Sequence, residues 1–377
     1  MTRFPRHAGL LEQLRARDRA RMLGTARSLD FASNDYLGLR NSADLGRAVS
    51  DALARGVAVG AGASRLLRGN DPEIVALEAE AAAFFGVEAS LFMGGGFQAN
   101  QAIFATLPMA GDLVLHDALI HASAHEGMRL GAADQRAFCH NDPQDADDQI
   151  RIWRASGGAG RIWIALETVY SMDGDFAPVP DFIALARQHD AILVLDEAHA
   201  TGLYGNLGRG LAPHAGDVAV IALHTCGKAL GASGALICAD QVVIDTLINR
   251  ARPFIYATAP SPLMAAAVRA ALRLLREQPG LRAHAAALRL HVQRMAGRLG
   301  FAHGGSQILP LPMGSDSAAL QAAAQLQDAG FDLRAIRPPT VPKGTARLRI
   351  SLTGGLQTPD IDALFGALAD LRAGATP

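Results

Sequence analysis

Short apolar runs and longer amphipathic segments follow one another along most of this chain. The short runs predict β-strands, and apolar residues spaced three or four positions apart predict α-helices. From about residue 72 the two kinds of segment alternate, which is typical of βαβ units and an open, largely parallel sheet. The predicted strands are 90–93, 112–115, 161–166, 192–195, 218–223 and 234–237, and the predicted helices are 72–85, 96–107, 118–130 and 180–189.

The two ends of the chain differ from this central part. Leucines set among charged residues predict an amphipathic helix over 10–23, and Ala/Leu/Arg segments in the last third predict helices over 261–276 and 281–299. Short strands are predicted near 308–312 and 345–351. We therefore expect an α/β protein with an N-terminal arm over 1–45, a large domain over 46–255 with a mainly parallel sheet between helices, and a smaller α+β domain over 256–377.

Composition and charge narrow the class of protein. Lys and Arg together number 35 and Asp and Glu 36, so net charge favours neither a nucleic acid nor an acidic membrane surface as a partner. No apolar run reaches the roughly 18 residues that a membrane-spanning helix needs. The three cysteines, Cys139, Cys226 and Cys238, show no CxxC spacing, which argues against a metal site or a disulfide framework. We expect a soluble, cytoplasmic enzyme that acts on small molecules without a metal.

Lys228 is one of only two lysines in the chain. It follows the apolar run 218–223 and lies between two small residues, Gly227 and Ala229, so its amine is expected in a shielded pocket. Burial lowers the pKa of an amine because it disfavours the charged form, and a nucleophilic lysine requires this. The alternative is a lysine that merely survives on the surface.

Asp196 ends the predicted strand 192–195 and would emerge at the mouth of the sheet. A carboxylate there, followed by a lysine about thirty residues later, is what pyridoxal phosphate requires: a partner for the pyridinium nitrogen and an amine for a covalent bond. A strand-terminal aspartate can also simply cap the next turn. His199 could bind the phenolic oxygen of the same ligand, although a lone histidine in a glycine-rich loop is more often a surface residue.

A glycine run, Gly94 to Gly96, follows the strand 90–93 and opens a helix with Phe97 in its first turn. Free N–H groups at the positive end of a helix dipole can hold a phosphate, but glycines can equally serve tight helix packing. The GxGxxG spacing of a dinucleotide site is imperfect here. Thr225 and Thr258 are further hydroxyl candidates for such a site.

Residues on other predicted elements could also contact a cofactor or substrate. His121 follows the strand that ends near His116, and its ring could stack on a cofactor or be structural. Arg347 and Arg349 alternate with apolar neighbours in a strand, where a guanidinium could clamp a substrate carboxylate with two hydrogen bonds. The alternation does not choose between the two arginines.

Several segments of the chain, taken in order, resemble the α-oxoamine synthases. These are fold-type I pyridoxal phosphate enzymes that condense an amino acid with an acyl thioester and release carbon dioxide. The resemblance spans residues 10 to 370 approximately, and it implies a homodimer with a shared active site. The segments are Asn34-Asp35-Tyr36-Leu37-Gly38-Leu39, Ser64-Arg65, Gly69-Asn70, Ser171-Met172-Asp173-Gly174-Asp175, Asp196-Glu197-Ala198-His199, Thr225 to Lys228, and Ile336-Arg337-Pro338-Pro339-Thr340-Val341-Pro342.

The resemblance also implies a role for each candidate residue. Lys228, once freed from the cofactor by the amino acid, would remove the α-proton of that substrate. The implied set comprises Lys228 for the covalent bond, Asp196 for the pyridinium nitrogen, His199 and Ser171 for the phenolic oxygen, His121 stacked on the ring, Gly96, Phe97 and Thr225 for the phosphate, Thr258 contributed by the other subunit, and Arg349 for the amino-acid carboxylate.

The chain departs from the family pattern at two positions. Family members usually have histidine four residues after the asparagine of the Gly-Asn pair, where this chain has Ile74. They usually have Ser-Gly before the aromatic residue, where this chain has Gly95-Gly96-Phe97. The second change still presents backbone amides to a phosphate, whereas the first removes one polar contact.

Within the family, the run 336–342 followed by Gly344 to Arg349 most resembles the branch that joins L-alanine to a pimeloyl thioester in biotin synthesis. The thioester carrier would be coenzyme A or an acyl carrier protein. Glycine C-acetyltransferase, 5-aminolevulinate synthase and serine palmitoyltransferase stay as alternatives. A catalytically silent partner subunit on the same fold is disfavoured because Lys228 and Asp196 are both retained.

Overall fold

The computed structural model describes residues 3–26, 29–212 and 216–374, and the chain forms two compact units. The larger unit comprises residues 35–171 and 176–284, and the smaller comprises 1–34, 172–175 and 285–377. This division differs from the expected segments 1–45, 46–255 and 256–377. Residues 1–34 of the expected arm belong to the smaller unit and residues 35–45 to the larger, and the last passage from the larger unit to the smaller comes after residue 284.

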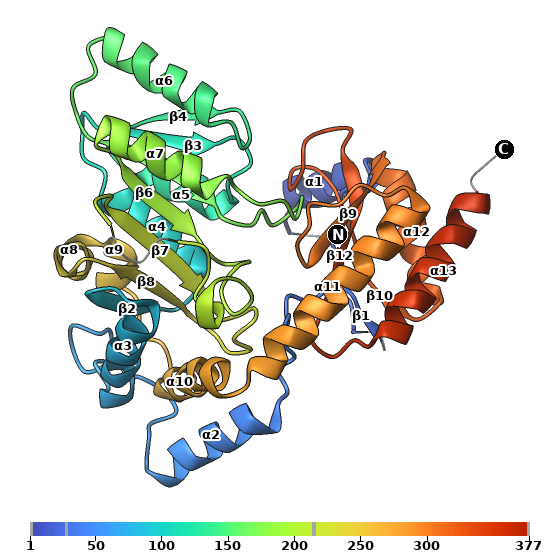
Figure 1. Ribbon diagram of the computed structural model, residues 1–377, viewed down its shortest axis with the longest axis horizontal. Coiled ribbons are helices and arrows are strands. Elements are labelled where there is room, and N and C mark those ends of the chain that lie inside the picture. Colours follow the sequence, from blue (N-terminus) through green and yellow to red (C-terminus); the bar gives the residue numbers. More distant parts are fainter. Residues whose placement is uncertain (1–2, 27–28, 213–215, 375–377) are drawn as a thin grey trace. The chain divides into compact units, whose positions relative to one another are not determined.

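A seven-stranded sheet forms the centre of the larger unit, in the order β2-β8-β7-β6-β5-β3-β4 (Figure 1). Its neighbouring strands are parallel except that β8 runs antiparallel to both β2 and β7. The predicted α/β fold with a mainly parallel sheet is therefore confirmed. The strands are β2 (Ala89–Met93), β3 (Leu113–Asp117), β4 (Asp134–Phe138), β5 (Ile162–Glu167), β6 (Ile192–Asp196), β7 (Val220–Thr225) and β8 (Ala235–Ala239).

Both faces of this sheet are buried, because successive residues of a strand point to opposite sides and nearly every residue of β2, β3 and β5 to β8 is buried. Val114, Val194 and Leu223 share one apolar core with helices α4 and α5. Helices α3, α6 and α7 also contact the sheet. The helices of this unit are α2 (Ala43–Ala54), α3 (Pro72–Phe85), α4 (Gly96–Thr106), α5 (Ala122–Leu130), α6 (Pro143–Ala155), α7 (Val179–His189), α8 (Gln241–Arg250), α9 (Arg252–Ile255), α10 (Pro262–Glu277) and the 3₁₀ helix η1 (Asn206–Gly208).

Local signals set the limits of α3. Asp71 is its N-cap and accepts a hydrogen bond from the Glu73 N–H at 2.8 Å, Pro72 lies in the first turn, and Gly86 ends the helix in the left-handed conformation. The predicted helix 72–85 is confirmed. Strand β4 was not predicted, because most of its residues are exposed or half-exposed and it lacks an apolar run.

The smaller unit contains a three-stranded antiparallel sheet in the order β11-β12-β9. Leu348 and Ile350 of β12 contribute to a core with helices α11, α12 and α13. Strand β1 pairs in parallel with β10, which joins the N-terminal arm to this unit. Its elements are α1 (Pro5–Ala16), β1 (Leu29–Asp30), α11 (Pro279–Leu299), whose first residues belong to the larger unit, β9 (Ile308–Gly314), α12 (Asp316–Asp328), β10 (Phe331–Asp332), β11 (Arg334–Ile336), β12 (Ala346–Ser351) and α13 (Thr358–Gly374).

The first helix of the chain is α1, so the prediction of a helix over 10–23 is wrong in its limits. Pro5 starts the helix, and Asp18 adopts a φ of 55° just beyond its end. No residue of α1 is buried, so the spacing of its leucines does not mark a core-facing stripe. Across the described ranges, no helix is long and apolar enough to cross a membrane.

Candidate active site

Three polar side chains leave the sheet of the larger unit at the carboxyl ends of neighbouring strands. Glu167 ends β5, Asp196 ends β6 and Thr225 ends β7. Asp196 pairs in register with both Glu167 and Leu223, and Thr225 lies two residues beyond Leu223. Because side chains alternate along a strand, all three project from the face that α4 and α5 cover. Ligands of parallel sheets bind at this edge.

Asp196 is buried, and both of its carboxylate oxygens accept hydrogen bonds. Oδ1 accepts from the Ala198 N–H at 2.9 Å, and Oδ2 accepts from Asn100 Nδ2 at 2.8 Å. The Asn100 amide also donates to Ser123 Oγ at 2.9 Å, and that oxygen lies 2.7 Å from His121 Nδ1. A continuous chain of hydrogen bonds therefore joins the two predicted residues Asp196 and His121.

His121 is the N-cap of α5, where its Nδ1 accepts a hydrogen bond from the Ser123 N–H at 3.2 Å. Although solvent reaches the residue, the pKa of His121 is lowered, mainly because neighbouring atoms displace water from its ring. The charge of Asp196 opposes this change and that of Lys228 adds to it. A neutral, flat ring held by its N-cap contact is suited to stacking.

Lys228 and His199 come together from the loops that follow β7 and β6. Lys228 Nζ lies 2.8 Å from His199 Nε2, and His199 Nδ1 lies 2.6 Å from the hydroxyl of Tyr36. Tyr36 and His199 are buried and Lys228 is half-buried. The predicted lysine and histidine thus share one hydrogen-bonded cluster with a tyrosine that sequence reasoning did not select.

A tight loop between the antiparallel strands β7 and β8 carries Lys228. The Cys226 N–H donates to the Gly234 carbonyl, and the Gly231 N–H donates to the Lys228 carbonyl, both at 2.9 Å. Gly231 has a φ of +65°, and a Cβ there would lie 2.5 Å from the backbone nitrogen of Arg40. Only glycine fits this position, and the close approach fixes the lysine loop against the segment that follows Tyr36.

Ser171 is buried beside Glu167, whose Oε2 accepts a hydrogen bond from the Ser171 N–H at 3.0 Å. Burial raises the pKa of Glu167 to about 8, with repulsion from Asp196 acting in the same direction and the positive charge of Lys228 opposing it. Glu167 therefore carries a proton near neutral pH, which avoids two adjacent buried negative charges.

The glycine run after β2 opens α4, but its amides are not equally available. The Gly94 N–H donates to Gln98 Oε1 at 2.9 Å, whereas α4 begins at Gly96 without a side-chain cap. A Cβ on Gly96 would lie 3.0 Å from Thr225 Cγ2, so the two residues are close. Thr225 Oγ1 is buried and has no hydrogen-bond partner among the described residues. An unused hydroxyl therefore lies beside an uncapped helix start.

Phe97 and Thr258 are both exposed. Thr258 borders a small pocket that Gly94 and Gln98 also line, so it is near the start of α4 within the same chain. The Ala259 N–H donates to the Ala63 carbonyl at 3.0 Å, which places the segment around Thr258 beside residues 63–69.

Arg347 and Arg349 lie in the smaller unit, on β12, and both are buried. Arg347 forms an ion pair with Asp173 at 2.5 Å. Arg349 donates to the neutral oxygens Ser351 Oγ at 2.7 Å and Asn34 Oδ1 at 3.1 Å. The engagement of Arg347 by a carboxylate of its own unit counts against it as the substrate clamp.

Sequence reasoning missed several residues of this cluster. Asn100 and Ser123 connect Asp196 with His121, Glu167 holds Ser171, and Tyr36 contacts His199. Each is a buried polar residue in an otherwise apolar setting, and such residues normally have a specific partner. Ile74, the departure from the family pattern, is fully buried in α3.

Comparison with known proteins identifies the family. The model of the family described as aminotransferase class I and II matches residues 26–368. The chain belongs to this family. It is 41% identical to an 8-amino-7-oxononanoate synthase of Maricaulis maris (strain MCS10) over 91% of this chain and 86% of that protein. This confirms the resemblance to the α-oxoamine synthases.

Solved structures share the fold. One described as SPT with PLP internal aldimine superposes with a TM-score of 0.88 at 24% identity, over 99% of each chain. An 8-amino-7-oxononanoate synthase from Francisella tularensis superposes with a TM-score of 0.75 at 25% identity, over 92% of this chain and 98% of the other. The predicted fold-type I architecture is confirmed.

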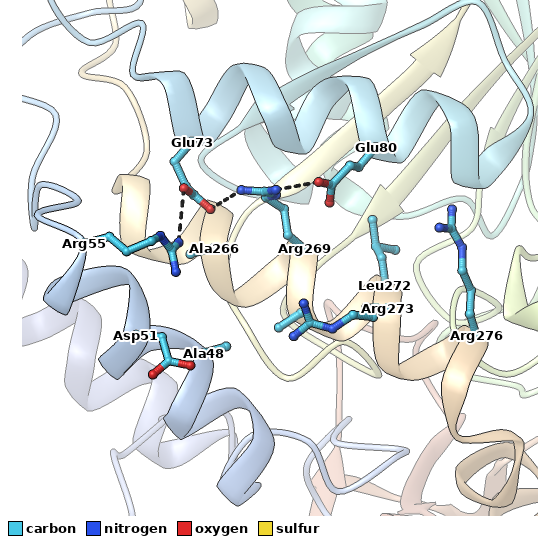
Figure 2. A pocket seen from close by; sticks show the side chains of 11 residues that line it. Ala48, Asp51, Arg55, Glu73, Glu80, Ala266, Arg269, Leu272, Arg273 and Arg276 are labelled. Carbon is cyan, nitrogen blue, oxygen red and sulfur yellow. Dashed lines mark hydrogen bonds and ion pairs between the residues drawn. The ribbon is translucent and has the colours of Figure 1, made fainter.

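A separate hollow lies between α2, α3 and α10 (Figure 2). Arg269 pairs there with both Glu73 and Glu80, and Arg55 lies 3.6 Å from Glu73. None of the predicted site residues lines this hollow. Within the described part of the chain, no group of three or more His, Cys, Asp or Glu side chains is arranged to hold a metal ion.

Proposed function

We propose that the chain is a pyridoxal phosphate-dependent 8-amino-7-oxononanoate synthase. It condenses L-alanine with a pimeloyl thioester, carried on coenzyme A or an acyl carrier protein, and releases carbon dioxide and a free thiol. The observation that carries the proposal is the contact of Lys228 with His199 in the unit where Asp196 ends the adjacent strand β6. The 41% identity to a synthase of this name over most of both chains supports the choice of reaction.

The side chains present fit pyridoxal phosphate. The buried, unpartnered hydroxyl of Thr225 beside the uncapped start of α4 supports a phosphate site with Gly96 and Phe97. Asp196, held by Asn100 and Ala198, would face the pyridinium nitrogen. The remaining contacts are assigned to Lys228 for the covalent bond, His199 and Ser171 for the phenolic oxygen, His121 for stacking on the ring, and Thr258 of the other subunit for the phosphate.

When bound, pyridoxal phosphate supplies an electron sink for the carbanion that forms at the α-carbon of the amino acid. Asp196 keeps a proton at the ring nitrogen, which sustains that capacity. Lys228 Nζ, displaced by the incoming amino acid, takes the α-proton and later returns a proton to the product. His199 holds Lys228 at 2.8 Å and so orients its lone pair.

Arg349 is assigned to the carboxylate of alanine because a guanidinium can bind it with two parallel hydrogen bonds. Its place on the buried strand β12 restricts its motion, and the Ser351 and Asn34 contacts set the plane of the guanidinium. Fixing this carboxylate orients the α-carbon for both proton removal and the attack on the thioester.

The decisive experiment compares substrates. We expect the highest kcat/KM, measured as free thiol release, for alanine with pimeloyl thioester among alanine, glycine and serine with pimeloyl, acetyl, succinyl and palmitoyl thioesters. One methyl group is worth only roughly 1–3 kcal/mol in a pocket, so glycine should react at a reduced rate rather than not at all. Preference for serine with palmitoyl thioester, or for glycine with acetyl or succinyl thioester, would assign the enzyme to another branch of the family.

Serine palmitoyltransferase is the second candidate function, because an enzyme of that name from Sphingomonas wittichii superposes with a TM-score of 0.87 at 26% identity. This identity is lower than the 41% to the Maricaulis synthase. Fold similarity is shared by the whole family and does not choose a substrate. The palmitoyl arm of the substrate comparison separates the two functions.

The proposed enzyme is a cytoplasmic homodimer in which Thr258 serves the site of the other subunit. Leu67 and Tyr256 are 77% and 71% exposed, on the segments next to Thr258. Exposed apolar side chains gathered there are suited to burial against a second copy. The free cysteines Cys139, Cys226 and Cys238 agree with a reducing compartment.

A mixed dimer tests this sharing. Lys228→Ala and Thr258→Asp are each expected to inactivate a homodimer, the second because an added carboxylate repels the phosphate. When the two variants are mixed and re-associate at random, about half of the dimers contain one subunit of each variant, and one of the two sites in each mixed dimer is intact. We therefore expect about a quarter of the native activity to return. No restoration in dimers proven to be mixed by light scattering and mass spectrometry would place Thr258 in the site of its own subunit.

A further inference from the structure

Tyr36, His199 and Lys228 form a line of three titratable groups. The Tyr36 hydroxyl lies 2.6 Å from His199 Nδ1, and His199 Nε2 lies 2.8 Å from Lys228 Nζ. Tyr36 is 1% exposed and His199 is 4% exposed. Their sequence positions are 163 residues apart, so this contact exists only in the folded larger unit.

The chemistry of imidazole links the two ends of this line. A neutral imidazole has one nitrogen that donates and one that accepts. When the Lys228 nitrogen carries a proton and donates to Nε2, Nδ1 must carry the ring proton and donate to the Tyr36 oxygen. When Nε2 donates instead, as it would to the phenolic oxygen of a bound cofactor, Nδ1 must accept from the Tyr36 hydroxyl. A tyrosine hydroxyl can serve either arrangement, because its single O–H rotates and its oxygen also accepts.

We propose that Tyr36 is a positioning residue that sets the tautomer of His199. It thereby prepares Lys228 both to remove the α-proton of the amino acid and to return a proton to the product. This inference rests on the proposed function and adds a residue to it. Tyr36 acts through His199, whose Nδ1 it contacts. The other titratable groups near Lys228 are Glu167 of β5 and His121 at the start of α5, whose pKa values the charge of Lys228 lowers, and Asp196, which ends β6 three residues before His199.

Packing of the buried ring does not explain why residue 36 is a tyrosine, with a hydroxyl group, rather than a phenylalanine. Phenylalanine fills almost the same volume and needs no polar partner, so packing alone would be met by either residue. A buried hydroxyl costs free energy unless it is hydrogen-bonded. Its 2.6 Å contact with His199, which also touches Lys228, gives the hydroxyl a role in placing protons.

The test compares Tyr36→Phe with the native holoenzyme. Without the hydroxyl, the Nδ1–H of His199 loses its acceptor whenever the Lys228 nitrogen is protonated and donating to Nε2. We therefore expect the pH titration of the Lys228 nitrogen, followed by the absorbance of the bound cofactor, to move to lower pH by about one unit. We also expect kcat to fall about tenfold with little change in the KM for alanine, and its pH profile to shift in the same direction.

Tyr170→Phe is the matched control, since Tyr170 is also 1% exposed in the larger unit. It should leave the absorbance titration unchanged. An unshifted titration and an unshifted kcat profile in a folded Tyr36→Phe protein would overturn the proposal. If Tyr36→Phe does not fold, 3-fluorotyrosine placed at position 36 keeps the hydroxyl but makes it more acidic, and an unchanged titration there would overturn the proposal equally.

The two proposals can fail separately. If the native enzyme prefers another amino acid, the absorbance titration of the bound cofactor still tests Tyr36. If Tyr36→Phe titrates like the native enzyme while alanine and pimeloyl thioester react well, the proposed function stands and the role of Tyr36 is refuted.

Discussion

We expect the Lys228→Ala variant to lose turnover by at least about a thousandfold and to bind pyridoxal phosphate without a covalent bond. The reason is that Lys228 is the only lysine of the larger unit and its amine contacts His199. Absorbance of the purified protein and mass spectrometry after borohydride reduction measure the covalent bond. Native protein should be yellow and should carry the reduced cofactor on the peptide that contains Lys228.

Lys343→Ala is the control, because Lys343 is exposed and is the other lysine of the chain. This variant should keep native colour and native kcat/KM. Borohydride labelling at Lys343, or turnover by Lys228→Ala near the native rate, would refute the assignment of Lys228 and with it the core of the proposed mechanism.

The second large effect is expected for Asp196→Asn. The amide preserves the size of the side chain and can still bond to Ala198, but it cannot hold a proton at the ring nitrogen of the cofactor by its charge. We expect kcat to fall roughly a thousandfold while the cofactor still binds. Equilibrium dialysis measures the binding, and single-turnover kinetics place the loss on the chemical step.

The rival interpretation of Asp196 is a turn cap. Asp117 provides the comparison, because it also ends a strand and its Oδ1 accepts a hydrogen bond from the Leu119 N–H at 2.7 Å. Asp117→Asn should lower the free energy of unfolding without a comparable loss in kcat. If Asp196→Asn behaved in the same way, Asp196 would be a cap and the acid of the site would have to be sought elsewhere.

The sequence predicts the central sheet well because buried strands leave continuous apolar runs. The strand ends carry Asp196 and the lysine loop, and so these two residues could be selected from sequence alone. Helix 72–85 could be placed because its cap, its proline and its terminal glycine are all local signals. Strand β4 has no such signal, since its side chains are largely exposed.

Contacts between distant segments could not be predicted. Tyr36 and His199 are separated by 163 positions in the sequence, and Asn100 and Asp196 by 96. No local sequence pattern therefore predicts either contact. The limits of the two units depend on the pairing of β1 with β10, which joins the arm to the last third of the chain. Arg347 and Arg349 alternate identically along β12, and they are distinguished by distant contacts, Asp173 for Arg347 and Asn34 for Arg349.

The close approach of Gly231 to Leu39 and Arg40 has an evolutionary consequence. Both the backbone angle and the lack of space exclude a side chain at Gly231, so the lysine loop cannot drift independently of the segment that carries Tyr36. An insertion or a bulkier residue on either side would displace the nucleophile. These two stretches of chain are therefore expected to change together or not at all across descendants that keep the activity.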